Sequence, residues 1–226
     1  MALEYKSIVP WGRSFKEYRA MFNLSDEDLK SSILGCGDGP ASFNAEMTRM
    51  GNKVVSCDPV YAFSKEQIQK RIDETFEEVM AQTRGHQDKF IWDHVQSLEN
   101  LGKIRMQAMA VFLEDFEAGV AEGRYIDAEL PKLPLEDNGF DLALCSHFLF
   151  LYSDHLSLAF HLDAILEMLR LARDVRIFPV LDYNAKQSIH LKPLMKSLEK
   201  KQISAQLEKV DYMFQRGGDH MLRVTR

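Results

Sequence analysis

The chain has 226 residues, of which 46% are hydrophobic, 10% aromatic and 27% charged, a composition that excludes disordered and fibrous proteins. Lysine and arginine number 28 against 34 aspartate and glutamate residues, which gives a formal net charge of −6. We therefore expect no nucleic-acid partner, because binding to phosphates needs clustered basic residues. The length fits a single domain that carries an insertion.

The sequence contains no segment typical of secretion or of a membrane span. Glu4 lies where a signal peptide would be apolar, and the longest uncharged stretch, 142–153, is too short to cross a bilayer. The three cysteines form no CxxC pair, so the pattern favours neither disulfides nor a zinc site. We expect a cytoplasmic protein with no membrane contact and no bound metal.

The first part of the chain predicts a strand, a glycine turn, a helix and a second strand in succession. Residues 32–34 are a short apolar run that stops at the glycine-rich turn 35–40. Residues 41–50 are predicted as a helix, because a glycine follows them as a C-cap. Residues 53–57 are β-branched and apolar, which predicts a strand that ends at Asp58.

Residues 62–122 are predicted as a helical insertion between the second and third strands. Apolar residues recur there at helical spacing, with a turn-rich break at 83–88. Loops at the carboxyl ends of parallel strands surround the ligand crevice of open α/β folds, so we expect the insertion to cap a pocket. The alternative is that it serves packing or a homodimer contact.

The second part of the chain alternates strands and helices and predicts a closing hairpin. The predicted elements are a strand at 124–126, a central strand at 140–145, a helix at 156–171, a strand at 175–180 and a helix at 190–200. Two alternating runs, 206–216 and 219–225, flank Gly217-Gly218 and indicate the hairpin. Strands that alternate with helices imply a mostly parallel sheet.

The glycine turn and the acid after the second strand mark a candidate ligand site. Gly37-Asp38-Gly39 lies where a strand passes into a helix, which is where open α/β sheets bind ligands through backbone N–H groups. Asp58 ends the neighbouring strand, and a carboxylate there can accept both hydroxyls of a ribose. The GxGxxG fingerprint fails because its third glycine would be Pro40. A nicotinamide oxidoreductase is therefore disfavoured.

Two segments resemble class I S-adenosylmethionine-dependent methyltransferases. Residues 33–41, Ile-Leu-Gly-Cys-Gly-Asp-Gly-Pro-Ala, are similar to the first motif of that family: apolar, apolar, acid, x, Gly, x, Gly, x, Gly. They depart from it at Gly35, where the family has an acid, and at Ala41, where it has the last glycine. A register that starts the glycines at Gly35 makes Ser31-Ser32 the strand core, so the first register is preferred. Residues 133–142 resemble the LPF-x-D-x-x-FD-x-V block of the small-molecule branch.

The resemblance implies a three-layer, Rossmann-like α/β fold with a mostly parallel seven-stranded sheet that ends in an antiparallel hairpin. Residues 1–226 would form one methyltransferase domain, in which residues 1–30 are an N-terminal lid. Within that lid, Arg13 is either a partner for a carboxylate of cofactor or substrate, or a plain surface residue.

The resemblance also implies S-adenosylmethionine as cofactor. The residues assigned to it are Gly35, Cys36, Gly37, Asp38, Gly39, Asp58, Pro59, Ser146 and, for the adenine amino group, either Asp127 or Glu129. Asp58 would bind the ribose hydroxyls. His147 would lie beside the transferred methyl group, where an unperturbed pKa of about 6.5 suits a general base. The alternative is that His147 only packs.

The implied function is methylation of a small molecule. The acidic charge balance and the absence of Asn-Pro-Pro-Tyr and Pro-Cys motifs disfavour methylation of nucleic-acid bases. One alternative is a protein that binds the cofactor without catalysis, which Gly35 favours because the usual acid is missing. Another is a protein methyltransferase.

Overall fold

The structure is a computed structural model that describes residues 9–93 and 95–226. Its strands are β1 (Ser32–Cys36), β2 (Lys53–Cys57), β3 (Tyr125–Ile126), β4 (Phe140–Ser146), β5 (Ala172–Phe178), β6 (Ser204–Lys209) and β7 (His220–Thr225). Its longer helices are α1 (Phe15–Met21), α2 (Phe43–Arg49), α3 (Lys65–Gly85), α4 (Leu98–Ala121), α5 (Leu158–Leu171) and α6 (Leu191–Lys200). Among the described helices, none combines the length and the apolar character that crossing a bilayer requires.

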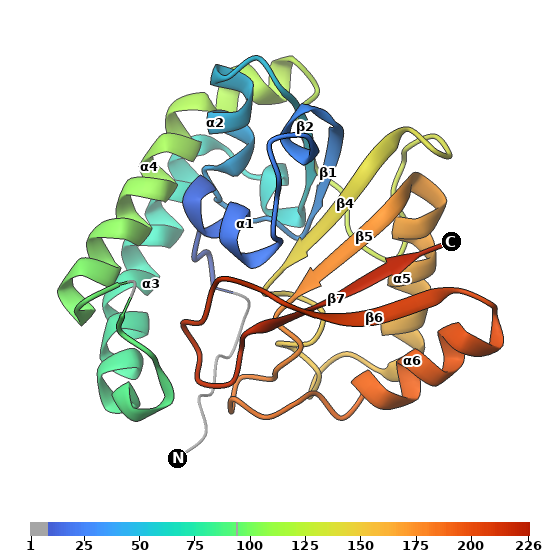
Figure 1. The fold of residues 1–226 in the computed structure, drawn as a ribbon. Helices are drawn as coiled ribbons and strands as arrows, with labels where there is room; N and C mark the ends of the chain where they lie inside the picture. Colours follow the sequence, from blue (N-terminus) through green and yellow to red (C-terminus); the bar gives the residue numbers. More distant parts are fainter. Residues whose placement is uncertain (1–8, 94) are drawn as a thin grey trace.

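The strands form one seven-stranded sheet in the order β3-β2-β1-β4-β5-β7-β6, with helices on both faces (Figure 1). Strands β1 to β5 pair in parallel, whereas β7 runs antiparallel to both β5 and β6. The predicted fold class, a mostly parallel sheet that ends in an antiparallel hairpin, is confirmed.

Side chains that alternate along the central strands supply two cores, one on each face of the sheet. On β1, Leu34 and Cys36 pack in the core that includes α5 and α6, whereas Ile33 packs in the core that includes α1 and α2. On β4, Ala143 and Leu144 separate in the same way. Both faces of β4 are covered, which explains why its sequence is nearly all apolar.

Helices α3 and α4 follow β2 and lie side by side at the edge of the sheet that holds β3 (Figure 1). Each begins at a serine that caps its first turn: Ser64 accepts a hydrogen bond from the backbone of Gln67, and Ser97 accepts one from the backbone of Asn100. The apolar stripes of the two helices meet in a core that includes Ile72. The helical spacing predicted helices in this insertion, and the structure shows that two of them pack on each other.

The closing hairpin differs from its prediction. The alternating pattern predicted a first strand over 206–216, but β6 ends at Lys209, and 210–219 form a loop. The predicted glycine turn lies within this loop, where the Gly218 N–H donates to the Gln215 carbonyl at 2.8 Å. This loop pairs with the turn between α3 and α4, where the Ile91 N–H donates to the Phe214 carbonyl at 2.7 Å. Backbone polar groups that leave the sheet are thereby satisfied.

Candidate functional site

A cavity of about 710 Å³ lies at the carboxyl ends of the parallel strands. Its walls come from the turns after β1, β2 and β4, from the segment after β3, from α3 and from the loop between β6 and β7. The volume falls within the roughly 300–1,000 Å³ of cofactor and small-molecule sites. The position is the one at which open α/β sheets bind ligands, because the strand order reverses between β1 and β4.

Most residues assigned to the cofactor line this cavity. They are Cys36, Gly37, Asp38, Gly39, Asp58, Pro59, Glu129 and Ser146, together with the candidate base His147. Gly35 and Asp127 are both described by the structure and are not part of the lining. Of the two acids considered for the adenine amino group, Glu129 is therefore the one at the cavity.

Asp58 joins the turns that follow β1 and β2. Its Oδ2 accepts a hydrogen bond from the Gly39 N–H at 2.8 Å, and its Oδ1 accepts one from the Val60 N–H at 2.8 Å. Burial raises the pKa of Asp58, and the two backbone donors oppose that shift. Each carboxylate oxygen keeps a second lone pair. Asp58 can therefore accept two more hydrogen bonds from a ligand in the cavity.

The two glycines of the turn after β1 have conformational reasons to be glycine. Gly37 and Gly39 have φ of 70° and 54°, in the left-handed region that side chains disfavour. At Gly37 a Cβ would also approach the Phe148 ring to 3.1 Å. The turn thus brings bare backbone to the cavity wall, as close approach of a ligand requires.

Gly35 departs from the methyltransferase motif for a steric reason. A Cβ at this position would lie 1.7 Å from Oδ2 of Asp38, so the Asp38 carboxylate fills the space of a side chain at position 35. There it accepts hydrogen bonds from the hydroxyls of Tyr18 at 2.8 Å and Ser56 at 2.7 Å. An acid is thus present at this place in the fold, but Asp38 supplies it from the turn.

We expect Gly35→Ala to lower the free energy of unfolding by about 1–3 kcal/mol, because the new methyl group forces Asp38 away from its two hydroxyl donors. Urea denaturation measures this loss. In an Asp38→Gly background the same substitution should cost much less. Equal costs in the two backgrounds would contradict the steric coupling between positions 35 and 38.

The Asp38 carboxyl also predicts a pH dependence of stability. Burial raises its pKa from 3.8 to about 6, the hydroxyls of Ser56 and Tyr18 oppose the shift, and the charge of Asp58 adds to it. Between about pH 4 and 6 the folded protein therefore binds more protons than the unfolded chain. The contribution of Asp38 to the free energy of unfolding consequently decreases as the pH rises from about 4 to 6.

Asp38→Asn should remove this dependence. Urea titrations at pH values from 7 to 4 should show that, as the pH falls, the free energy of unfolding of the wild-type protein increases relative to that of the variant. A constant difference between the two proteins would contradict the raised pKa of Asp38.

His147 follows β4 in a left-handed backbone conformation, with φ of 52°. Its N–H donates to the Phe178 carbonyl at 2.6 Å, and its Nδ1 lies 2.9 Å from Ser146 Oγ. Burial, followed by the charges of Arg13 and Arg105, lowers its pKa well below 6.5. The expectation of an unperturbed pKa is wrong, and the imidazole is neutral at pH 7.

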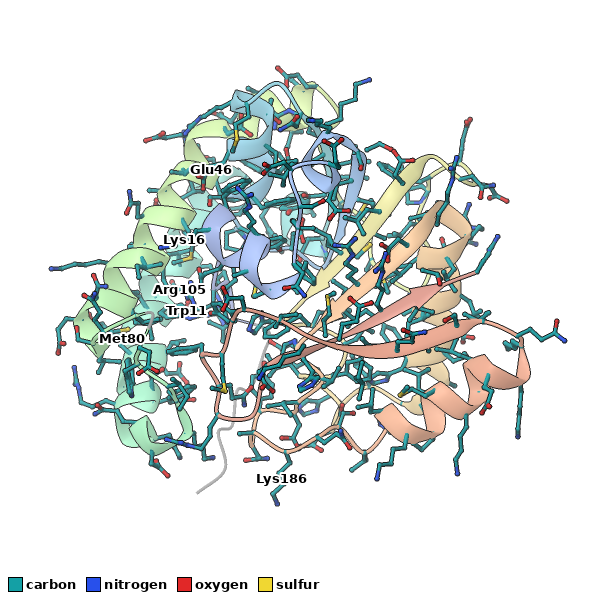
Figure 2. All side chains as sticks on the ribbon, in the orientation of Figure 1. Trp11, Lys16, Glu46, Met80, Arg105 and Lys186 are labelled. Carbon is teal, nitrogen blue, oxygen red and sulfur yellow. The ribbon has the colours of Figure 1, made fainter. Side chains whose placement is uncertain are left out.

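A buried ionic cluster beside the cavity was not predicted. Arg105 of α4 is fully buried and binds both carboxylate oxygens of Glu17 of α1, at 2.5 and 2.6 Å. Tyr212 of the β6–β7 loop donates to the same carboxylate at 2.8 Å. In Figure 2, Arg105 reaches from α4 toward the body of the protein. The cluster therefore ties the helical insertion to α1 and to the loop that closes the cavity.

Electrostatics accounts for the ionised state of this cluster. Burial opposes ionisation of Glu17, but the charge and hydrogen bonds of Arg105 outweigh it and hold the pKa of Glu17 well below its ordinary value. No local pattern could have identified the pair, because 88 positions separate the two residues and an arginine in a helix is usually exposed.

No family model matches the chain. Solved structures with a similar fold include magnesium protoporphyrin IX methyltransferase of Synechocystis PCC 6803, which is 14% identical to this chain with a TM-score of 0.44. The match covers 89% of this chain and 73% of that one. A SAM-dependent methyltransferase of Aquifex aeolicus is 14% identical with a TM-score of 0.41, over 93% of this chain and 94% of that one. Precorrin-6y C5,15-methyltransferase of Geobacter metallireducens is 14% identical with a TM-score of 0.43, over 94% of this chain and 85% of that one.

The sequence comparison extends over nearly the whole chain. The uncharacterized protein MJ0045 of Methanocaldococcus jannaschii is 33% identical over 225 residues, which cover 99% of this chain and 99% of that protein. At this identity and coverage, the chain belongs to the same protein family as MJ0045.

Proposed function

We propose that the chain is an S-adenosylmethionine-dependent methyltransferase that acts on a small molecule. The proposal rests on one observation: Asp58 and the 37–39 turn line the same cavity, and Asp58 Oδ2 accepts a hydrogen bond from the Gly39 N–H. These are the positions that the methyltransferase motif assigns to the cofactor, and the cavity volume of about 710 Å³ suits a nucleoside ligand.

The residues at the cavity fit this cofactor. The free lone pairs of Asp58 suit the two ribose hydroxyls, and Glu129 offers an acceptor for the adenine amino group. Asp38 supplies the carboxylate that the family has at the position of Gly35. The missing acid was the argument for a non-catalytic binding protein, and the placement of Asp38 weakens that argument.

Bound S-adenosylmethionine supplies an electrophilic methyl group on its sulfonium. What the protein adds is alignment of the acceptor and, where the acceptor carries a proton, a base. His147 lies where this role would be filled and is neutral, but burial and the charges of Arg13 and Arg105 lower its pKa and make it a weaker base than a free imidazole. If Nδ1 carries the ring proton and donates to Ser146, Nε2 remains the acceptor.

Thermal unfolding with S-adenosylmethionine, S-adenosylhomocysteine and NAD in parallel tests the proposal. A ligand at 100 times its dissociation constant stabilises the folded state by about 2.7 kcal/mol, which raises Tm by several degrees in a protein of this size. We expect this rise with both sulfur nucleotides and none with NAD. No shift with either sulfur nucleotide, checked by calorimetric titration, would refute the proposed cofactor.

A further inference from the structure

Arg13 places a positive charge on the cavity wall without a carboxylate bound to it. Its Nη1 donates to the Trp11 carbonyl at 2.8 Å, and its Nε is buried and has no hydrogen-bond partner among the described residues. Glu17 is the acid of the neighbouring cluster, but both of its carboxylate oxygens are bound by Arg105. Within the described part of the chain, no acidic side chain forms an ion pair with Arg13.

Arg105 and Glu17 are the charged residues that act on Arg13, and together with Arg13 they do not cancel in charge. Arg13 and Arg105 contribute two positive charges against the single negative charge of Glu17, and His147 is neutral. Burial lowers the pKa of Arg13 to about 10, so its guanidinium stays charged at neutral pH. Because Arg13 shares the single carboxylate of Glu17 with Arg105, an anionic ligand group in the cavity would be favoured at this position.

The backbone around Arg13 is fixed against the turn after β1. The Arg13 carbonyl accepts a hydrogen bond from the Ser42 N–H at 3.0 Å, at the start of α2. Gly12 packs so closely on this turn that a Cβ would lie 2.0 Å from the Pro40 carbonyl oxygen. The guanidinium is thus held at the cavity before any ligand arrives, and its planar fork matches a carboxylate.

The walls of the same cavity are rich in aromatic rings. The rings that line it are those of Trp11, Phe63, Phe90, Phe148, Tyr152, Tyr183 and Phe214. Phe90 and Phe214 stack at 4.7 Å, and Tyr152 and Tyr183 meet edge to face at 4.9 Å. Flat apolar surfaces of this kind suit a planar ligand.

We propose that the methyl acceptor is an aromatic carboxylic acid whose carboxylate binds Arg13. The inference rests on the proposed function, and it adds the substrate class. Arg13 and His147 both line the cavity, and the charge of Arg13 lowers the pKa of His147. An acid held by Arg13 would therefore lie near the candidate base.

Three aromatic acids paired with their primary amides test this proposal: benzoate, 2-naphthoate and indole-3-acetate. Each is titrated calorimetrically into protein saturated with S-adenosylhomocysteine. Because a hydrogen bond to a charged group contributes about tenfold or more in affinity, we expect at least one acid to bind at least about tenfold more tightly than its amide. Arg13→Gln should abolish that preference while leaving the affinity for S-adenosylhomocysteine unchanged.

Arg19→Gln is the matched control. It removes the same charge from the exposed side of α1, where Arg19 pairs with Asp26, and it should keep the preference for the acid. Arg13→Lys retains the charge and should keep part of the preference, which preserves the test if Arg13→Gln does not fold.

Three results would overturn the proposal. Equal affinity of the wild-type protein for every acid and its amide, or no binding of any acid, would refute the substrate class alone. A large loss of S-adenosylhomocysteine affinity in Arg13→Gln would assign Arg13 to the cofactor's carboxylate instead. Failure of the wild-type protein to bind S-adenosylhomocysteine would overturn the proposed function as well.

Discussion

Replacing Arg105 by methionine is expected to lower the free energy of unfolding by about 3–5 kcal/mol, because the largely buried Glu17 carboxylate loses the arginine that binds both of its oxygens. Urea denaturation at pH 7 measures the loss. The variant should also loosen the insertion, since Arg105 of α4 bonds to α1 through this carboxylate. Hydrogen exchange should then show faster exchange in α4.

Arg49→Met is the matched control for this substitution. Arg49 is about half exposed and lies 3.4 Å from Glu114 of α4, so its ion pair is a surface pair worth at most about 1 kcal/mol. Removing the carboxylate as well, in Glu17→Leu/Arg105→Met, should recover much of the lost stability, because no buried charge of this pair then remains. Equal losses for Arg49→Met and Arg105→Met would contradict the buried ion pair.

Asp58→Ala is expected to weaken binding of S-adenosylmethionine and S-adenosylhomocysteine by about 100-fold or more. The substitution removes the acceptors proposed for two ribose hydroxyls, and each hydrogen bond to a charged group contributes about 1.5–3 kcal/mol. It also frees the Gly39 N–H, so the turn after β1 loses its fixed position. Calorimetric titration measures the affinity.

Asp127→Ala and Glu129→Ala complete this experiment. Asp127 does not line the cavity and acts on Asp58 only through its charge, so its removal should change the affinity much less than removal of Glu129, which should lower it. Wild-type affinity in a folded Asp58→Ala protein would refute the proposed cofactor site. Circular dichroism establishes that each variant is folded.

Local patterns in the sequence were sufficient for the order of elements and for the edge of the sheet that carries the site. A strand at 32–34, the glycine turn and Asp58 after β2 were all predicted, because apolar runs and glycine turns are properties of neighbouring residues. In the structure β1 continues through the first residues of the predicted turn and ends at Cys36. The all-apolar run of β4 likewise indicated a strand buried on both faces. These signals placed most candidate site residues at one cavity.

The end of the hairpin shows where local patterns fail. Residues 210–216 continue the alternation of β6 beyond Lys209, so the sequence predicted a longer strand. In the structure the backbone of this segment bonds to the turn between α3 and α4, through Ile91 and Phe214. That turn lies more than 100 positions away in the chain, and only the packing of the insertion brings it there.

By itself, the sequence determined the α/β class, the mostly parallel sheet with its closing hairpin and the carboxyl-terminal edge that holds the site, because hydrophobic period and turn chemistry are local. Only the tertiary structure decided the rest: that Asp38 fills the space beside Gly35, that Glu17 and Arg105 pair, and that His147 is neutral. Burial and the approach of charges from distant segments set these features, and neither can be read from spacing along the chain.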